Sequence, residues 1–259
     1  MIPLKDDIPT RRFPVLTVAI IAICCAAYFL FERGLWDLGD TGNERVFEYG
    51  AIPYEVTHPG DECGVTVEGS VSCERQAGAP VGQAPDQAPW WITIFASMFL
   101  HGSFLHLAGN MLFLWIFGNN IEDSMGRVRY VVFYLLGGLA ALALQIVTDP
   151  DSAIPTVGAS GAIAAVLGGY ALLYPRARVI TVIFIIIIFT IVELPALLVL
   201  GFWFLLQLLP AFSEPMGEGG GGIAYFAHIG GFLFGMLLIK LFANNVHDDY
   251  EASHRLPVY

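Results

Sequence analysis

Four polar residues inside apolar stretches carry groups that could take part in acyl transfer. Ser160 is a potential nucleophile, His228 a potential base, and His106 and Asn110 are potential hydrogen-bond donors. A serine hydroxyl is a weak nucleophile until a base removes its proton, and histidine is the usual base. His106 and Asn110 are one helical turn apart, so both could donate to a developing oxyanion beside the backbone N–H of Ser160.

No acidic residue shares this part of the pattern, so we expect a dyad of Ser160 and His228 and not a Ser-His-Asp triad. Such chemistry needs no cofactor, and we expect none. Simpler explanations stay open for each residue taken alone. The small residues of GASG also suit helix packing, His228 could make an interhelical hydrogen bond, and His106 with Asn110 could cap or brace a helix.

The elements that hold these residues must lie in a membrane, because 56% of the 259 residues are hydrophobic and only 14% are charged. We predict an all-α membrane protein with six crossings in one domain, 1–259. An apolar stretch from 179 to 212 is too long for one crossing and breaks at Glu193-Leu194-Pro195, since proline disfavours helix. We expect 179–192 to be an interfacial or membrane-dipping connector. The rival interpretation is that 179–212 makes two crossings in place of one. The six spans are 13–31, 104–121, 130–147, 160–174, 194–212 and 223–242.

Basic residues favour six crossings with both termini in the cytoplasm, because cytoplasmic flanks of membrane spans are enriched in lysine and arginine. In this topology nine lysines and arginines lie on the cytoplasmic side and three lie outside. We interpret the first span as an uncleaved anchor, since it is long for a signal peptide and lacks a convincing cleavage site. The nine are Lys5, Arg11, Arg12, Arg127, Arg129, Arg176, Arg178, Lys240 and Arg255; the three are Arg33, Arg45 and Arg75.

The second, fourth and sixth spans all run from outside to inside, so the four polar residues lie at similar depth in the outer half of the membrane. Small residues mark one face of the fourth span (Ser160, Ala164, Gly168) and one face of the sixth (His228, Gly231, Gly235). Such stripes let helices approach closely. If they pack together, His228 meets Ser160. The fourth span is about 22 Å long, so its first turn can begin below the membrane surface.

An extracytoplasmic insert at 32–89 carries the sequence CGVTVEGSVSC, whose alternating valines suggest a hairpin. In an oxidising compartment Cys63 and Cys73 are expected to form a disulfide. A metal site with His58 is the alternative, although the spacing matches no zinc pattern. Cys24 and Cys25 read as apolar filler. No nucleic-acid signature is visible, and the net charge of −11 gathers mainly in the outside loops, which gives no reason to expect a polyanionic partner such as a nucleic acid.

Three motifs in order resemble the rhomboid family of intramembrane serine proteases, over about 90–242: HGSFLHLAGNMLFLWIFGNNIED, GASGA and AHIGGFLFGML. The resemblance implies a six-helix bundle with Ser160 as nucleophile, His228 as base, and Asn110 and His106 at the oxyanion hole. It also implies that the substrate is the transmembrane helix of another protein, entering past the fifth span. YPRARV and LPALLVLGFWFLLQ look like the bacterial branch, which implies a bacterial inner membrane and its lipid bilayer as surroundings.

Two features depart from this pattern. Some members carry a tyrosine four residues after the serine, stacked on the histidine, where this chain has Ala164. A tryptophan-arginine pair of the first outside loop is absent, and the insert stands there instead.

Two other functions remain open. A pseudoprotease would bind membrane helices without cutting them, but this chain retains Ser160, His228, HxxxN and GxSG. A small transporter or channel would explain polar residues inside the membrane, but the spans show no paired carboxylates and no inverted repeat.

Overall fold

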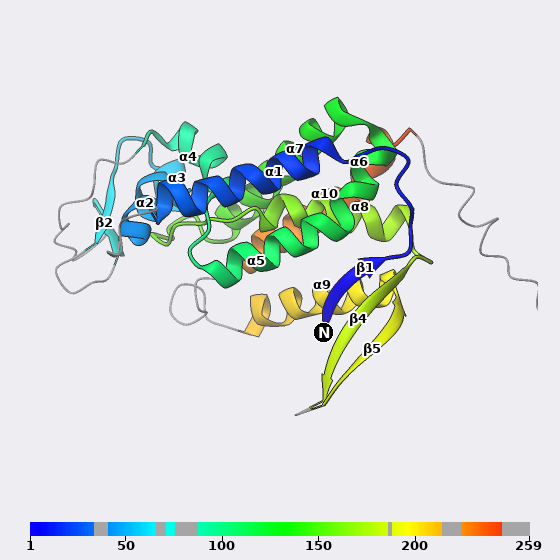
Figure 1. Ribbon diagram of the computed structural model, residues 1–259. Coiled ribbons are helices and arrows are strands. Elements are labelled where there is room, and N and C mark those ends of the chain that lie inside the picture. The colour runs from blue at the N-terminus through cyan, green and yellow to red at the C-terminus, as the bar shows by residue number, and fades with distance from the viewer. Residues whose placement is uncertain (34–40, 66–70, 76–87, 186–187, 214–223, 245–259) are drawn as a thin grey trace, which may run out of the picture.

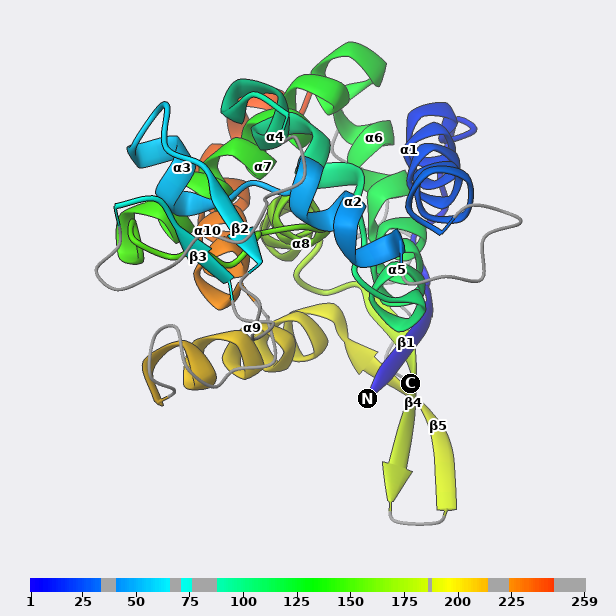
Figure 2. The ribbon, with the colours of Figure 1, turned by 90° about the vertical axis from the view of Figure 1, so that its left-hand side faces the viewer.

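A computed structural model describes residues 1–33, 41–65, 71–75, 88–185, 188–213 and 224–244. These residues are mainly helical, and α8 (Ser160–Leu173) lies at the centre of the bundle with other helices around it (Figure 2). Every residue of α8 from Gly161 to Ala171 is buried. Its apolar, small-residue sequence explains this position, because a helix that is apolar on all sides can be surrounded by other helices.

Three described helices are long and apolar enough to cross a membrane, and a fourth is added if a pair bent by 74° counts as one span. Two shorter apolar helices, α8 and α9 (Ala196–Ser213), accompany them. The three long ones are α1 (Val15–Ala26) continued by η1 (Ala27–Glu32), α7 (Arg127–Thr148) and α10 (Tyr225–Phe242). The bent pair joins α4 (Trp90–Ala96) and η2 (Ser97–Phe99) to α5 (Phe104–Phe113), η3 (Leu114–Gly118) and α6 (Asn119–Met125).

These helices fall where the six crossings are predicted, within a few residues at each end. The helical membrane architecture is therefore confirmed, while the count of six and the orientation of the termini stay predictions. Large apolar side chains remain exposed on the outer faces of the bundle, among them Leu105, Leu209 and Leu237. Lipid would cover such faces in a membrane.

The predicted connector after α8 forms two paired strands, β4 (Arg178–Ile185) and β5 (Ile188–Pro195). Its isoleucine, valine, phenylalanine and threonine residues are those that favour strands. The rival prediction of two helical crossings is therefore wrong, because the first half of the segment is not helical in the part that the structure describes. The helix break lies where predicted, since α9 begins directly after Pro195.

An N-terminal strand, β1 (Ile2–Asp6), pairs antiparallel with β4 and completes a sheet of order β1-β4-β5. The β4–β5 hairpin projects away from the helices (Figures 1 and 2). Asp6 ends β1 and is buried, and its carboxylate accepts hydrogen bonds from Tyr170 of α8 and Asn120 of α6. The chain before the first crossing is thus fastened to the bundle.

The described part of the insert contains α2 (Thr41–Tyr49), α3 (Pro53–Thr57) and the paired strands β2 (Cys63–Val65) and β3 (Val71–Cys73). The predicted disulfide between Cys63 and Cys73 is confirmed. The alternative metal site is wrong, because both thiols are joined and the His58 ring stacks on Tyr54. Cys24 is a buried free thiol in the main core, as expected of apolar filler.

The insert supports the loop that leads into α8. Ala51 and Thr156 exchange backbone hydrogen bonds, the N–H of Tyr54 donates to Ser152, and the Thr57 hydroxyl donates to the carbonyl of Pro150. Since Ser160 follows a few residues later, the disulfide-bonded insert helps to fix the start of α8.

Candidate active site

Ser160 is the first residue of α8, and the backbone before it takes a turn that requires glycine. Gly158 has φ +123°, a conformation that side-chain-bearing residues rarely adopt, and its N–H donates to the carbonyl of Ser97 at 2.8 Å. Ala159, just before the helix, offers no side-chain cap. N–H groups in the first turn of a helix lack partners within the helix, so that of Ser160 is available to a ligand.

His228 lies in the first turn of α10, and its Nε2 is 2.7 Å from the Oγ of Ser160. The predicted meeting of these two residues is confirmed. Both side chains are half-buried, so the pair is neither sealed in the core nor open to bulk solvent.

The close approach of α8 and α10 depends on glycine, as the two stripes predict. A Cβ on Gly231 would collide with the carbonyl oxygen of Gly161, and a Cβ on Gly235 would collide with that of Ala165. The partners differ slightly from the predicted stripe, because Gly231 and Gly235 meet the backbone of Gly161 and Ala165, while the Ala164 side chain lies beside Gly231. The contact itself is backbone against backbone, which glycine alone permits.

His106 and Asn110 lie on α5, whose N-cap Ser103 accepts a hydrogen bond from the His106 N–H. The His106 ring lies against Gly158, where a Cβ would come within 2.7 Å of its Cε1 and Nε2 and within 3.4 Å of the Ser160 Oγ. The structure thus brings His106 beside Ser160. The starts of α5, α8 and α10 therefore lie close together, while the predicted direction of these helices across a membrane stays a prediction.

Asn110 is buried one turn further along α5, and its Nδ2 has no hydrogen-bond partner among the described residues. An unpaired buried amide donor costs about 1–3 kcal/mol, so its retention calls for a reason. A donor directed at a transient anion is one such reason.

Two residues of α9 also contact His228, and the sequence argument did not include them. The Gln207 Oε1 lies 2.7 Å from Nδ1 of His228, and the Trp203 ring centroid lies 5.8 Å from that of the imidazole. Gln207 could have been found, because it is a polar residue in an apolar span, the same signal that points to His228. Trp203 carried no such signal in a helix rich in aromatic residues.

His101 is a second residue beyond the sequence argument. It is fully buried between η2 and α5, and its ring contacts that of His106 edge-on at 5.2 Å. His101 therefore supports His106 as a packing partner.

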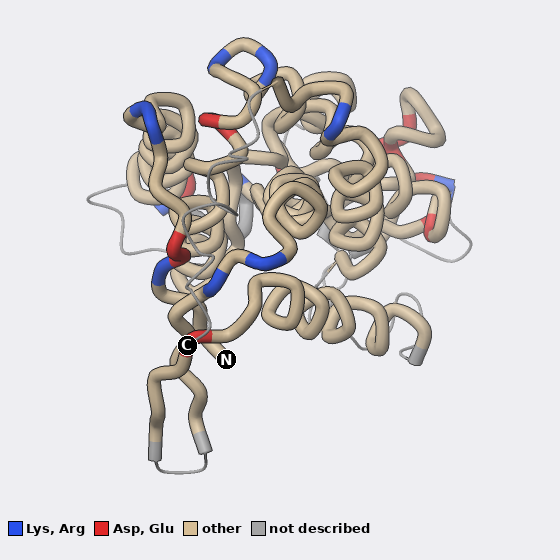
Figure 3. Tube along the Cα trace, turned by 90° about the vertical axis from the view of Figure 1, so that its right-hand side faces the viewer, with Lys and Arg blue, Asp and Glu red and all other residues tan. Residues whose placement is uncertain are grey.

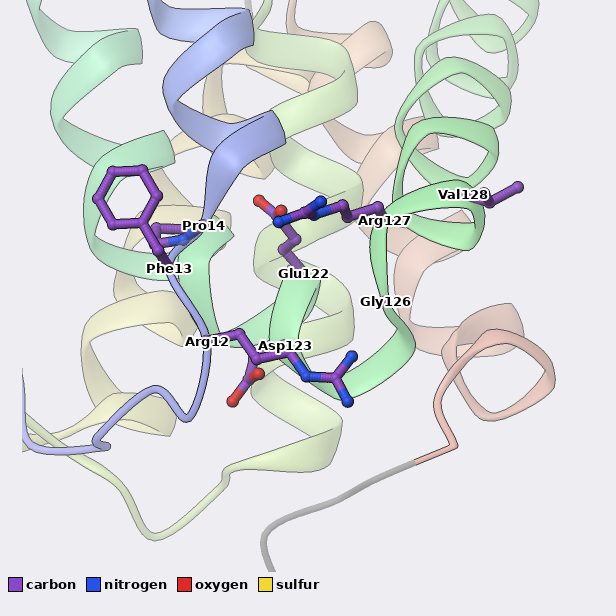
Figure 4. A pocket seen from close by; sticks show the side chains of 8 residues that line it. All are labelled: Arg12, Phe13, Pro14, Glu122, Asp123, Gly126, Arg127 and Val128. Atoms are coloured by element: carbon purple, nitrogen blue, oxygen red, sulfur yellow. The ribbon is translucent and has the colours of Figure 1, made fainter.

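A pocket of about 440 Å³ lies at the opposite end of the bundle, where α1 begins and α6 meets α7 (Figure 4). Its carboxylates hold the chain that enters α1: Glu122 accepts from the N–H groups of Leu16 and Thr17, and Asp123 from that of Arg11. No serine or histidine lines it, so we assign it an anchoring role. It is lined by Arg12, Phe13, Pro14, Glu122, Asp123, Gly126, Arg127 and Val128.

Apolar helices surround a buried central helix, and a serine and a histidine lie in hydrogen-bond contact at its start, so the fold is that of a helical membrane protein with a polar site. A family model described as Rhomboid domain matches residues 88–245, which is more than half of the chain. The chain belongs to the rhomboid family. This match includes all four predicted site residues and both α9 residues.

Known proteins give the same family assignment over a shorter region. The chain is 37% identical over 97 residues to Rhomboid protease GluP of Bacillus subtilis, which is 38% of this chain and 18% of that protein. It is 32% identical over 99 residues to RHOMBOID-like protein 5 of Arabidopsis thaliana (38% and 32%), and 32% over 97 residues to the mitochondrial Rhomboid protein 1 of Saccharomyces cerevisiae (36% and 28%). The matched regions span less than a third of each of these relatives.

Proposed function

We propose that this protein is an intramembrane serine endopeptidase that cleaves transmembrane helices of other membrane proteins near their extracytoplasmic end. One observation carries the proposal: the 2.7 Å contact between Nε2 of His228 and Oγ of Ser160 at the start of the central helix. Membership of a family that includes a relative named a protease supports it.

In the proposed reaction His228 takes the proton of the Ser160 hydroxyl while Oγ attacks the carbonyl carbon of the scissile peptide bond. The tetrahedral intermediate carries an oxyanion, to which the Ser160 N–H, the Asn110 amide and the His106 ring donate hydrogen bonds. Its collapse expels the amine, which receives the proton from His228. Water, again deprotonated by His228, then hydrolyses the acyl-enzyme ester and regenerates Ser160.

The topology that goes with this function has six crossings in one domain, 1–259, with both termini cytoplasmic and the insert 32–89 outside. Basic residues support it, since Figure 3 shows many of the lysines and arginines at the end of the bundle that faces the viewer. This end carries the start of α7 and the segment after α8, far from Ser160. A bacterial inner membrane is the proposed location, by analogy with the bacterial relative.

The test is cleavage of a single-span substrate in liposomes by the purified protein and its Ser160→Ala and His228→Ala variants, with a fluorophosphonate probe alongside. We expect cleavage and labelling by the wild type and neither by the two variants. Labelling that survives Ser160→Ala would place the nucleophile elsewhere. Binding of the substrate without any cleavage would identify a pseudoprotease and overturn the proposal.

A further inference from the structure

Gln207 holds the side of the His228 ring that faces away from Ser160. Its Oε1 is 2.7 Å from Nδ1, while the other ring nitrogen, Nε2, is 2.7 Å from the Ser160 Oγ. Each imidazole nitrogen therefore has one partner. The ring is held between an amide on α9 and a hydroxyl on α8.

The orientation of the Gln207 amide follows from its second hydrogen bond. Its Nε2 donates to the backbone carbonyl of Trp203, one turn earlier in α9, at 3.3 Å. Turning the amide over would set its oxygen against that carbonyl oxygen, and two acceptors cannot satisfy each other. The amide oxygen must therefore face His228.

An amide oxygen only accepts hydrogen bonds, so the Nδ1 of His228 must carry a proton. A neutral imidazole then has its lone pair on Nε2, which faces Ser160. This tautomer is the one that can remove the serine proton. After transfer, the Nδ1–H of the imidazolium still points at the amide oxygen, and a hydrogen bond from a charged donor is stronger than one from a neutral donor.

We infer that Gln207 is a positioning residue that fixes the tautomer and the ring orientation of His228. In a Ser-His-Asp triad a carboxylate has this task. An amide does it without placing a second ionised group at membrane depth, where a charge is costly. Trp203, on the same face of α9 as Gln207, packs beside the ring, with its centroid 5.8 Å from that of the imidazole.

The expected effect of Gln207 on the reaction rate rests on the proposed proteolysis. The variants Gln207→Leu and Gln207→Glu test this effect. Leucine has a similar size but no acceptor, so kcat should fall about 10- to 100-fold while KM changes little. Glutamate keeps an acceptor and should retain most of the turnover, with the acid limb of the pH-rate profile moved to higher pH because a carboxylate stabilises the imidazolium. Leu206→Met, on the exposed face of α9, is the matched control and should behave as wild type.

A purely structural role for Gln207 would give the opposite order, with Gln207→Leu as active as the wild type and Gln207→Glu impaired by a buried charge. That result would overturn the inference.

The tautomer can also be measured without any cleavage, by 15N NMR of histidine-labelled Ser160→Ala protein in detergent, with His228→Ala identifying the signal among the six histidines. We expect His228 protonated on Nδ1, and a mixture of tautomers once Gln207→Leu is added. A proton on Nε2 in the Ser160→Ala protein would refute the inference. If the protein proves not to cut substrates but shows the Nδ1 tautomer, the proposed function fails and the positioning role stands.

Discussion

At the scale of single residues, the unpaired amide of Asn110 makes a specific kinetic prediction. Asn110→Ala should lower kcat more than it weakens substrate binding, by up to about 10²-fold, because an oxyanion donor acts in the transition state and not in the ground state. Steady-state kinetics in liposomes measure this. Redundancy with His106 would reduce the loss, so the Asn110→Ala/His106→Ala double variant is the control. An unchanged kcat in both would remove these side chains from the mechanism.

The individual site residues differ in how well they could be predicted from the sequence. Ser160 and His228 could be paired from sequence, because each is a polar residue in an apolar span and each begins a stripe of small residues. Gln207 is also a polar residue in an apolar span, but its contact with His228 could not be derived from sequence. It depends on how α9 is rotated against α10, and α9 lacks a stripe of small residues that would fix its rotation.

At the scale of elements, the disulfide of the insert should stabilise the fold. The chain-entropy model gives about 3 kcal/mol for a loop of this length, which the Cys63→Ser/Cys73→Ser variant would lose. Because the insert is hydrogen-bonded to the loop before α8, we expect a lower apparent Tm in detergent and reduced turnover. Cys25→Ala, which removes a free thiol, should change neither. Equal Tm values for the double variant and the wild type would show that the insert is not coupled to the bundle.

The attachment of β1 should depend on pH through Asp6. Burial raises the pKa of Asp6 to about 6, and the neighbouring Asp7 adds to the rise, while the Tyr170 hydrogen bond and Lys5 oppose it. The folded state thus binds this proton more tightly than the unfolded chain, so the stabilisation is complete below about pH 4 and is lost as pH rises through about 6.

Thermal unfolding in detergent from pH 4 to 8 tests the Asp6 prediction. Relative to Asp6→Asn, which cannot ionise, the apparent Tm of the wild type should fall as pH rises, by an amount that corresponds to at most about 3 kcal/mol. Parallel Tm curves for the two proteins would contradict the assignment of the titration to Asp6.

The elements also show where sequence patterns stop being informative. The break before Ala196 could be predicted because proline leaves few alternatives. The β4–β5 hairpin could not, since a run of isoleucine, valine and phenylalanine suits a membrane helix and a strand alike. Pairing with β1, in which Ile2 lies opposite Val182, joins segments far apart in sequence and is a tertiary contact that no local pattern contains.

At the scale of the whole molecule, the site lies at one end of the bundle and the pocket lined by Glu122 and Asp123 lies at the other. Ser160 begins a helix of 14 residues, about 21 Å long, which is shorter than the ~30 Å hydrocarbon core of a bilayer. In the proposed topology Ser160 therefore lies within the membrane and not on its surface. In the proposed orientation this is the outer half. Only bonds near the extracytoplasmic end of a substrate helix can then reach it, and such a bond must be unwound before attack.

The most direct test of the claim that Ser160 cleaves substrate helices near their extracytoplasmic end is mass-spectrometric mapping of cleavage sites. Single-span substrates are reconstituted with the wild type or with Ser160→Ala for this purpose. We expect cuts near the extracytoplasmic end, after a small residue such as alanine, in substrates with glycine or proline close to the cut, and no cuts with Ser160→Ala. Cuts in the cytoplasmic half, a preference for stable poly-leucine helices, or cleavage by Ser160→Ala would contradict it.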